Sequence, residues 1–264
     1  MTKLWRWFGN NLIRIYAVLG FTYLFIPIAY TFAFSFNDSG KSNLVWRGFT
    51  LSNWQNPCGA PDVCTALGNS IQVGLIATIF ATILGTLIAF ALVRHRFRGR
   101  SSTNLLIFLP MATPEVVLGA SLLALFLNLG LPLGPTTIII AHIMFCISFV
   151  VVTVKSRLQG MDPRLEEAAQ DLYADEAATF RYVTFPLVAP GIAAAALLSF
   201  SLSFDDYIIT NFNSGTTVTF PMYVWGAAQR GIPPQVNVIG TLMFFGSLAI
   251  VLVAQVVGRA RQKK

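Results

Sequence analysis

The chain has 264 residues, of which 55% are hydrophobic and only 11% are charged, and its formal net charge is +7. Soluble globular domains carry about 25% charged residues, so this composition excludes an ordinary soluble enzyme or binding module. The positive charge does not require a nucleic acid partner, because basic residues also accumulate in the cytoplasmic loops of membrane proteins. We therefore expect an integral membrane protein that contacts membrane lipids.

Six stretches are long and apolar enough to cross the hydrocarbon core of a membrane as helices, which takes about 20 residues each. They are approximately residues 15–36, 71–93, 105–129, 136–154, 187–212 and 238–257. In the third stretch, Pro110 and Pro114 predict a kink. The predicted fold class is all-α, a polytopic membrane protein with six transmembrane helices. Residues 1–264 are expected to form a single domain with its core at about 67–257.

Basic residues are distributed unevenly over the loops between these stretches. Of the 18 lysines and arginines, only Lys41, Arg47 and Arg230 lie on one side of the membrane, and the other 15 lie at the termini and in the remaining loops. Cytoplasmic loops carry an excess of lysine and arginine. We therefore expect both termini and the loop 155–186 in the cytoplasm, and the loops 37–69 and 213–234 outside the cell membrane.

The first external loop contains Cys58 and Cys64, with five residues between them. Because the outside of a cell allows disulfides to persist, a small disulfide loop is the interpretation that we favour. Two free thiols or a metal site are the alternatives, although no other cysteine and no histidine lies nearby in the sequence. Cys146, in the fourth apolar stretch, is interpreted as a small packing residue.

The last external loop carries an apolar and aromatic patch from Met222 to Trp225. Pro221, Pro233 and Pro234 surround it and are expected to break helices. The patch has two possible roles, contact with an external protein or an ordinary place at the membrane interface, where aromatic residues are enriched.

A polar segment lies between the fourth and fifth apolar stretches. Six of the chain's eleven acidic residues fall in it or just before it: Asp162, Glu166, Glu167, Asp171, Asp175 and Glu176. Asp162 followed by Pro163 predicts the start of a first helix, over about 162–172. Asp175 predicts the start of a second helix, over about 175–183. The segment therefore reads as two short helices on the cytoplasmic side.

This concentration of acidic residues in one loop predicts a docking surface for a cytoplasmic partner. The contact face of the first helix would consist of Ala168, Ala169, Leu172 and Tyr173, which combine little bulk with one aromatic anchor. A short amphipathic helix of this kind suits a groove on a soluble protein. The charge partners would be Glu166, Glu167 and Asp171. The alternative is a loop that is polar and helical only for solubility.

The same loop resembles the "EAA" loop of type I ABC importer permeases, which grips the cytoplasmic ATPase. The family's pattern is Glu-Ala-Ala, a glycine four positions after the second alanine, and then, after nine residues, Ile-x-Leu-Pro. The residues in register here are Glu167, Ala168, Ala169, Val183, Phe185 and Pro186. Tyr173 stands where the family has its glycine. A tyrosine in the left-handed conformation of that turn costs about 1–2 kcal/mol, so either this strain is tolerated here or the turn is built differently.

Resemblance to this prokaryotic family implies a particular assembly. It implies two permease chains, the second being a different chain, two copies of an ATP-binding subunit, and an external substrate-binding protein. ATP and Mg²⁺ would bind to the ATPase, so that this chain binds no cofactor and is not an enzyme. Gly40-Lys41-Ser42 looks like the end of a phosphate-binding loop, but Ser35 stands where such a loop needs a glycine.

Three further passages look like the permease subunits of spermidine/putrescine importers, a branch of this family. They are residues 108–115, FLPMATPE, residues 142–160, HIMFCISFVVVTVKSRLQG, and residues 198–209, LSFSLSFDDYII. The resemblance covers most of the chain from about residue 69 to residue 257. It implies a polyamine as the substrate, and leaves open whether this is spermidine, putrescine or another small organic cation.

Only three acidic residues lie within the apolar stretches, Glu115, Asp205 and Asp206. A carboxylate at membrane depth costs about 3 kcal/mol on insertion scales and usually faces a partner or an aqueous path. Ser199, Ser203, Asp206 and Thr210 would form one polar stripe down the fifth helix. Aromatic faces for ammonium groups would come from Phe204, Tyr207 and Phe212. The predicted cation path is lined by Glu115, Ser199, Ser203, Asp205, Asp206 and Tyr207.

Each of these residues has a structural alternative. Asp205 or Asp206 would then cap a helix end or bond a sister subunit, and Glu115 would bond backbone groups freed by the kink. His142, in the fourth stretch, is interpreted as a packing or interhelical hydrogen-bond residue. A different class of function, an ATP-independent cation channel or secondary transporter, predicts inverted repeats with paired acids in both halves. The first half has no counterpart of Asp205-Asp206, and that class leaves the Glu167 loop unexplained.

Overall fold

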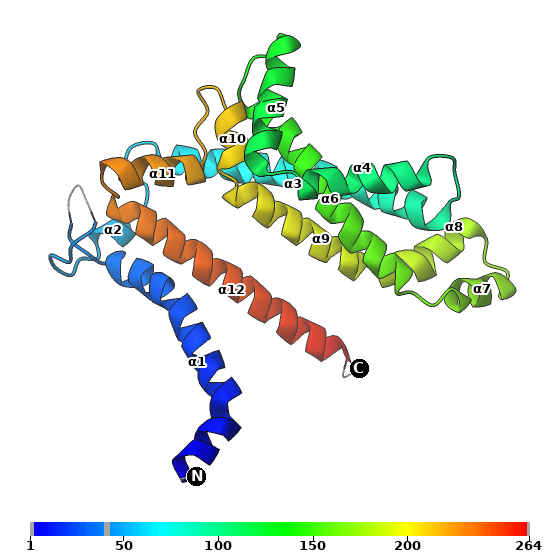
Figure 1. Ribbon diagram of the computed structural model, residues 1–264, viewed down its shortest axis with the longest axis horizontal. Coiled ribbons are helices and arrows are strands. Elements are labelled where there is room, and N and C mark those ends of the chain that lie inside the picture. The colour runs from blue at the N-terminus through cyan, green and yellow to red at the C-terminus, as the bar shows by residue number, and fades with distance from the viewer. Residues whose placement is uncertain (1–2, 40–42, 263–264) are drawn as a thin grey trace. The chain divides into compact units, whose positions relative to one another are not determined.

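The computed structural model describes residues 3–39 and 43–262, and within them the side chains of residues 11–39, 43–249, 251 and 252 (Figure 1). Gly40-Lys41-Ser42 and the terminal lysines 263 and 264 lie outside the described residues. Over the described ranges the fold is nearly all-helical, and apart from helices it has one isolated antiparallel bridge, between Asn37 and Phe49. The predicted all-α class is thereby confirmed.

Contacts divide the chain into two compact units, residues 1–64 with 224–264, and residues 65–223. In the first unit, α1 (Lys3–Phe34) packs against α12 (Pro234–Gln262), with the rings of Phe32 and Phe245 edge to face at 5.7 Å. The single membrane domain over 1–264 stays a prediction from the sequence.

The described part of the loop after α1 is held together by buried asparagines and stacked aromatic rings. The Asn37 side-chain amide donates to Asn43 Oδ1 at 2.7 Å, and the Asn43 amide donates to the Phe34 carbonyl at 2.7 Å. Phe36 stacks on Trp54, which follows the start of the short helix α2 (Ser52–Gln55), with ring centroids 5.3 Å apart. Buried amides with satisfied hydrogen bonds make this loop an ordered structure rather than a loose connection.

Cys58 and Cys64 form a disulfide in this loop, with their Cα atoms 5.4 Å apart, and Cys146 is a buried free cysteine. Closing so short a loop is expected to stabilise the folded state by about 2–3 kcal/mol in the chain-entropy model. In native membranes both thiols should therefore resist alkylation until a reductant is added. Mass spectrometry of the unreduced peptide checks this, with the buried Cys146 as the internal control. Two alkylated cysteines before reduction would contradict the prediction.

The second unit is organised around α6 (Pro135–Gln159), whose largest fully buried side chains are Ile138, His142, Val150, Val151 and Val154. It packs against α4 (Arg100–Ala112), α5 (Glu115–Asn128), α9 (Phe185–Asp205) and α10 (Ile208–Asn213). It also meets α3 (Val63–Arg94), where a Cβ on Gly85 would lie 2.6 Å from a Val150 methyl carbon. Close helix packing of this kind is typical of membrane interiors, where small residues let backbones approach.

Four helices in the described ranges are long and apolar enough to cross a membrane: Asn11–Phe34, Val63–Arg94, Pro135–Gln159 and Glu176–Asp205. Helices α4 and α5 satisfy this condition only together, and they are bent by 107° at the break between them, so the number is four or five. The sixth predicted stretch is helical in α12, but few of its side chains after residue 249 are described. The number of six spans therefore stays a prediction.

The third predicted stretch breaks where a kink was expected. Helix α4 ends at Ala112, Thr113 is extended with ψ at 131°, and α5 begins at Glu115. Pro114 explains the break, because proline disfavours the helical conformation of the residue before it and lacks an N–H of its own. The bend of 107° fits a broken span or a re-entrant segment.

The fifth predicted stretch, 187–212, is wrong as one continuous helix. Helix α9 ends at Asp205, Asp206 is extended with φ −65° and ψ 125°, and the chain resumes as α10. At the other end, α8 (Glu176–Thr179) continues through η1 (Phe180–Thr184), a π-helix, into α9. The second loop helix predicted to end near residue 183 is therefore part of the span. Pro186 directly follows the π-helix, where the regular helical ladder is already interrupted.

The loop 213–234 contains a helix that was not predicted from the sequence. Residues Phe220–Arg230 form α11, and Pro221 lies in its first turn. Proline is favourable at the first helical positions, where its missing N–H leaves no bond unmade, so the expected breaker begins a helix instead. The backbone N–H of Phe220 donates to the Ser70 hydroxyl of α3 at 2.8 Å and fixes this start.

Candidate functional site

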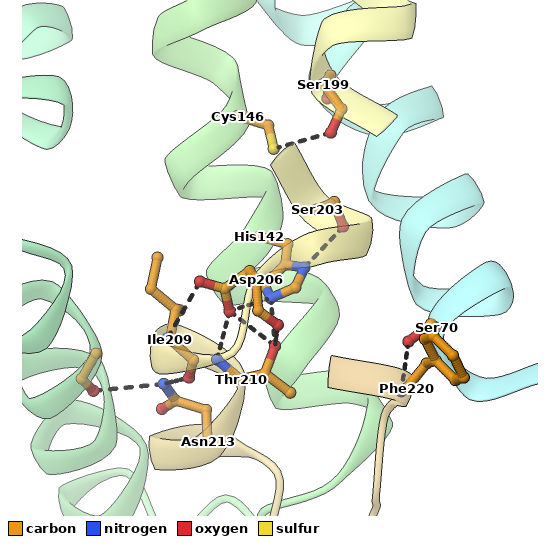
Figure 2. Close-up of polar contacts among 11 residues, drawn as sticks. Ser70, His142, Cys146, Ser199, Ser203, Asp206, Ile209, Thr210, Asn213 and Phe220 are labelled. Atoms are coloured by element: carbon orange, nitrogen blue, oxygen red, sulfur yellow. Dashed lines mark hydrogen bonds and ion pairs between the residues drawn. The ribbon is translucent and has the colours of Figure 1, made fainter. Parts of the chain in front are cut away.

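The break between α9 and α10 is stabilised by the carboxylate of Asp206. Its Oδ2 accepts from the backbone N–H of Thr210 at 2.7 Å and from the Thr210 hydroxyl at 2.8 Å, and its Oδ1 accepts from the N–H of Ile209 at 3.3 Å (Figure 2). The first N–H groups of a helix have no partner within the helix, and a preceding aspartate commonly satisfies them. Asp206 is buried and caps α10, which is the structural alternative that the sequence left open.

His142 of α6 contacts both sides of this break (Figure 2). Its Nδ1 lies 2.7 Å from the Ser203 hydroxyl of α9, and its Nε2 lies 2.9 Å from the Thr210 hydroxyl of α10 and 3.3 Å from Asp206 Oδ2. The side chain is 1% exposed. The interpretation of His142 as an interhelical hydrogen-bond residue is confirmed. That it connects two elements across a helix break could not be seen in the sequence, because the break itself was not predicted.

The polar stripe predicted on the fifth helix lies against α6. Ser199 and Ser203 are buried, and the Cys146 thiol donates to the Ser199 carbonyl at 3.6 Å. Ser199 and Ser203 share one face of α9, since residues four apart share a face, but Asp206 lies at the break and Thr210 lies in α10, so the predicted stripe does not run down a single helix. The prediction that Ser199 and Ser203 are exposed to a substrate path is wrong, because the packing of α6 on α9 covers that face. Cys146 is a packing residue, as expected.

The buried cluster consists of His142, Ser199, Ser203, Asp206 and Thr210. The other predicted path residues lie outside it. Asp205, the last residue of α9, is exposed, and Tyr207 is half-buried. Glu115 is exposed in the first turn of α5. Among the described side chains, neither Glu115 nor Asp205 forms an ion pair with a basic residue. The structure thus separates two neighbouring aspartates, one buried and capping and the other open at the surface.

The loop 155–186, predicted to be cytoplasmic, has an exposed apolar tip. Helix α7 (Arg164–Asp171) ends in a turn where Leu172 is 82% exposed and Tyr173 is 99% exposed. Tyr173 has φ at +64°, which is the left-handed conformation expected for the glycine position of the family pattern. Asp175 begins the next helix as predicted, because its carboxylate accepts from the Ala178 N–H at 2.7 Å. Glu167, Ala168 and Phe185 are exposed as well, Ala169 is half-buried, and Pro186 is exposed.

Glu166 has a different role from the one expected. Its carboxylate pairs with the guanidinium of Arg94, at the end of α3, and accepts a hydrogen bond from the Thr184 hydroxyl of η1. It therefore holds α7 to the cytoplasmic ends of two other elements, and it is not a free charge partner for a docking protein. Sequence reasoning missed Arg94 and Thr184, since no spacing signal connects residues so far apart in the chain.

The Tyr173→Gly substitution tests the stability of the turn separately from the docking of a partner protein on it. Glycine adopts a positive φ freely, so the turn should become more stable by about 1 kcal/mol, a roughly fivefold slowing of local amide exchange. If the exposed ring serves as an anchor, the same substitution should weaken retention of a cytoplasmic partner. Tyr173→Asn is the matched control, because asparagine also tolerates this conformation but has no ring. Hydrogen exchange and pull-down measure the two effects, and slower exchange with full retention would remove the anchor role.

Comparison with known proteins places these features in a family. The family described as binding-protein-dependent transport system inner membrane component matches residues 81–263. The chain is 37% identical over 256 residues to the spermidine/putrescine transport system permease protein PotC of Escherichia coli K12, covering 97% of this chain and 95% of the relative. It is 39% identical over 243 residues to the putrescine transport system permease protein PotI of the same strain, covering 89% and 85%.

Solved structures agree on the fold. A bacterial ABC transporter involved in the import of the acidic polysaccharide alginate matches with a TM-score of 0.64 at 18% identity, over 98% of both chains. An amino acid ABC transporter matches with a TM-score of 0.58 at 18% identity, over 76% of this chain and 96% of the other. Matches at this identity establish the fold alone. The family match and the two relatives carry the assignment further: this chain belongs to the binding-protein-dependent transport system inner membrane components, the permease subunits of ABC importers.

Proposed function

We propose that this permease forms the translocation path for polyamines, spermidine or putrescine, delivered by an external binding protein. The observation that carries the proposal is the identity of 37% to 39%, over most of the chain, to two permeases that are both named for polyamine transport. The charge pattern of the described residues supports it. Exposed carboxylates at Glu115 and Asp205 attract ammonium groups and repel anions such as sulfate.

The path in this proposal is lined by Glu115, Asp205 and Tyr207. Asp205 and Glu115 would accept charge-assisted hydrogen bonds from substrate ammonium groups, and the Tyr207 ring would offer a cation–π face. Ser199, Ser203 and Asp206 would shape this path from behind, since they are buried against α6. A carboxylate left exposed to lipid would be costly, which favours a polar surrounding for Asp205 in the assembled transporter.

The cytoplasmic loop in this proposal is the coupling element that docks on the ATPase. The exposed Leu172 and Tyr173 provide an apolar anchor for a groove on a soluble partner, and Glu167 lies beside them as an exposed charge. The assembly would contain two copies of the ATP-binding subunit, which bind ATP and Mg²⁺, a second and different permease, and the external binding protein. Titratable groups of this chain would take no part in hydrolysis.

The membrane topology in this proposal has six spans with both termini in the cytoplasm of a prokaryotic cell. The distribution of lysine and arginine supports this orientation, because 15 of 18 lie on one side under that assignment. The disulfide between Cys58 and Cys64 agrees with an external position of its loop.

Reconstitution tests the proposed function directly. The permease is expressed with its partner ATPase, second permease and binding protein, and the purified complex is placed in proteoliposomes with ATP on the ATPase side. We expect uptake of labelled spermidine or putrescine that requires both ATP and the binding protein. Uptake that proceeds equally without ATP would show a channel or secondary transporter instead. ATP-dependent uptake of another small organic solute would keep the permease assignment and replace the substrate.

A further inference from the structure

A single histidine connects the two helices that meet at the break in the fifth span. His142 reaches Ser203, in the last turn of α9, with Nδ1 at 2.7 Å. It reaches Thr210, in α10, with Nε2 at 2.9 Å. Figure 2 shows the imidazole between these two hydroxyls, with the Asp206 carboxylate beside it. A buried side chain that bonds both sides of a helix break holds the ends of the break in one arrangement.

The hydrogen bonds around the imidazole agree with one neutral tautomer. The Thr210 hydroxyl donates to Asp206 Oδ2 at 2.8 Å, so its oxygen accepts from an N–H at Nε2. Nδ1 then carries the lone pair and accepts from the Ser203 hydroxyl. Each polar atom in the chain from Ser203 through His142 and Thr210 to Asp206 has a partner, which is what a buried network requires. The tautomer follows from the partners, as it must for histidine.

Asp205 directly precedes the break that His142 bridges. This residue ends α9, a helix of 21 residues, at the pole where the helix dipole is negative and the last carbonyls lack helical N–H partners. An acidic residue at this pole is locally unfavourable, and its carboxylate is exposed. A bound cation would relieve the repulsion. A local conflict of this kind, next to the hydrogen-bonded chain from Ser203 to Asp206, is typical of a functional position.

We propose that His142 is a positioning residue for the substrate cation: it bridges α9 and α10, and thereby holds Asp206 as a buried cap and Asp205 open to a substrate ammonium group. The proposal rests on the proposed function of polyamine transport. His142 itself touches no substrate in this scheme. It acts through the geometry of the break, so its contribution should disappear when Asp205 no longer carries a charge.

A double-mutant cycle tests this dependence. His142→Leu removes both hydrogen bonds, and Asp205→Asn removes the charge with little change in shape. Each single variant should raise the KM for spermidine at least tenfold, with a much smaller change in maximal uptake per complex. The KM of the double variant should exceed that of the more severely affected single variant by no more than about twofold, because the effects of interacting residues are not additive. Effects that multiply in the double variant would show that His142 acts elsewhere, and would overturn the proposal.

Two conservative variants test the hydrogen bonds of His142 to Ser203 and to Thr210 separately. The side-chain amide of His142→Asn lies near the position of Nδ1 and retains the Ser203 contact, whereas that of His142→Gln extends toward Nε2 and retains the contact with α10. Both should transport with KM values between those of the wild type and His142→Leu. If His142→Leu, His142→Asn and His142→Gln all fail to accumulate as complexes, His142 is needed for folding alone, and the positioning role is overturned.

A measurement without substrate distinguishes this proposal from the proposed function. In the full complex, Asp205→Cys should react rapidly with a charged thiol reagent, whereas Asp206→Cys should react at least tenfold more slowly. Adding His142→Leu should change the labelling rate of Asp205→Cys several-fold. An unchanged rate overturns the positioning role, whatever the complex transports. Absence of polyamine uptake by the wild-type complex contradicts the proposed function only, and the labelling comparison still decides the role of His142.

Discussion

Leu172→Asp is expected to abolish ATP-driven uptake while leaving the chain inserted in the membrane. Leu172 is 82% exposed at the tip of the cytoplasmic loop, so the substitution leaves the fold of the chain almost unaffected. If this side chain fills a groove of the ATPase, a charge at its position costs at least about 2 kcal/mol of docking energy, or roughly thirtyfold in affinity. Retention of the ATPase during purification and uptake per permease molecule measure the effect.

Two further variants control for loss of folding and for charge. Leu172→Met keeps an apolar side chain of similar volume and should retain both the ATPase and uptake. Glu167→Lys reverses an exposed charge beside the tip and should also uncouple the complex, although less completely, because exposed charge pairs contribute little each. Normal uptake by Leu172→Asp at normal abundance would show that the loop is helical for solubility alone.

Asp205→Asn and Asp206→Asn are expected to fail in different ways. Asp205 is exposed and outside the buried cluster, so losing its charge should lower uptake per complex by roughly tenfold or more, the equivalent of one charge-assisted contact of about 1.5–3 kcal/mol. Asp206 accepts three hydrogen bonds at the start of α10. Its replacement should weaken the cap and reduce the amount of assembled complex, with a smaller effect on uptake per surviving complex.

Uptake and subunit amount must be measured on the same membranes to separate these outcomes. Glu115→Gln is a useful third variant, since Glu115 is exposed on another helix and should follow the pattern of Asp205. If both aspartate variants lower abundance and leave uptake per complex unchanged, the electrostatic argument for a cationic substrate is lost. The relatives would then be the sole support for a polyamine.

Most features of the loop 155–186 could be predicted from the sequence. Asp175 caps a helix as predicted, because an aspartate that precedes a helix satisfies local N–H groups whatever the remaining fold. Tyr173 adopts a positive φ at the position of the family's glycine. The continuous passage from α8 through η1 into α9 was missed, because a π-helix leaves no periodic signal of its own. Glu166 was misjudged, because its partner Arg94 lies 72 positions away in the chain.

In the membrane spans, too, the features set by a single segment could be predicted, and those set by contacts with distant residues could not. Composition and the length of apolar stretches predicted a helical membrane protein, since hydrophobicity and the rise of a helix are properties of the segment alone. Pro114 predicted the place of the bend in the third stretch but not its size of 107°. No proline or glycine in the sequence indicates the break at Asp206. The residue that stabilises the break, His142, comes from another helix.

Composition, spacing and short motifs were enough to predict the membrane class, the family and the place of the acidic loop between the fourth and fifth apolar stretches. The tertiary structure alone decided which of two adjacent aspartates is buried and which is exposed. Asp205 and Asp206 are chemically identical and neighbours in the chain, so no local rule can distinguish them. Their difference arises where α6 packs on α9 and α10, because the imidazole of His142 and the Thr210 hydroxyl of α10 both lie beside the carboxylate of Asp206.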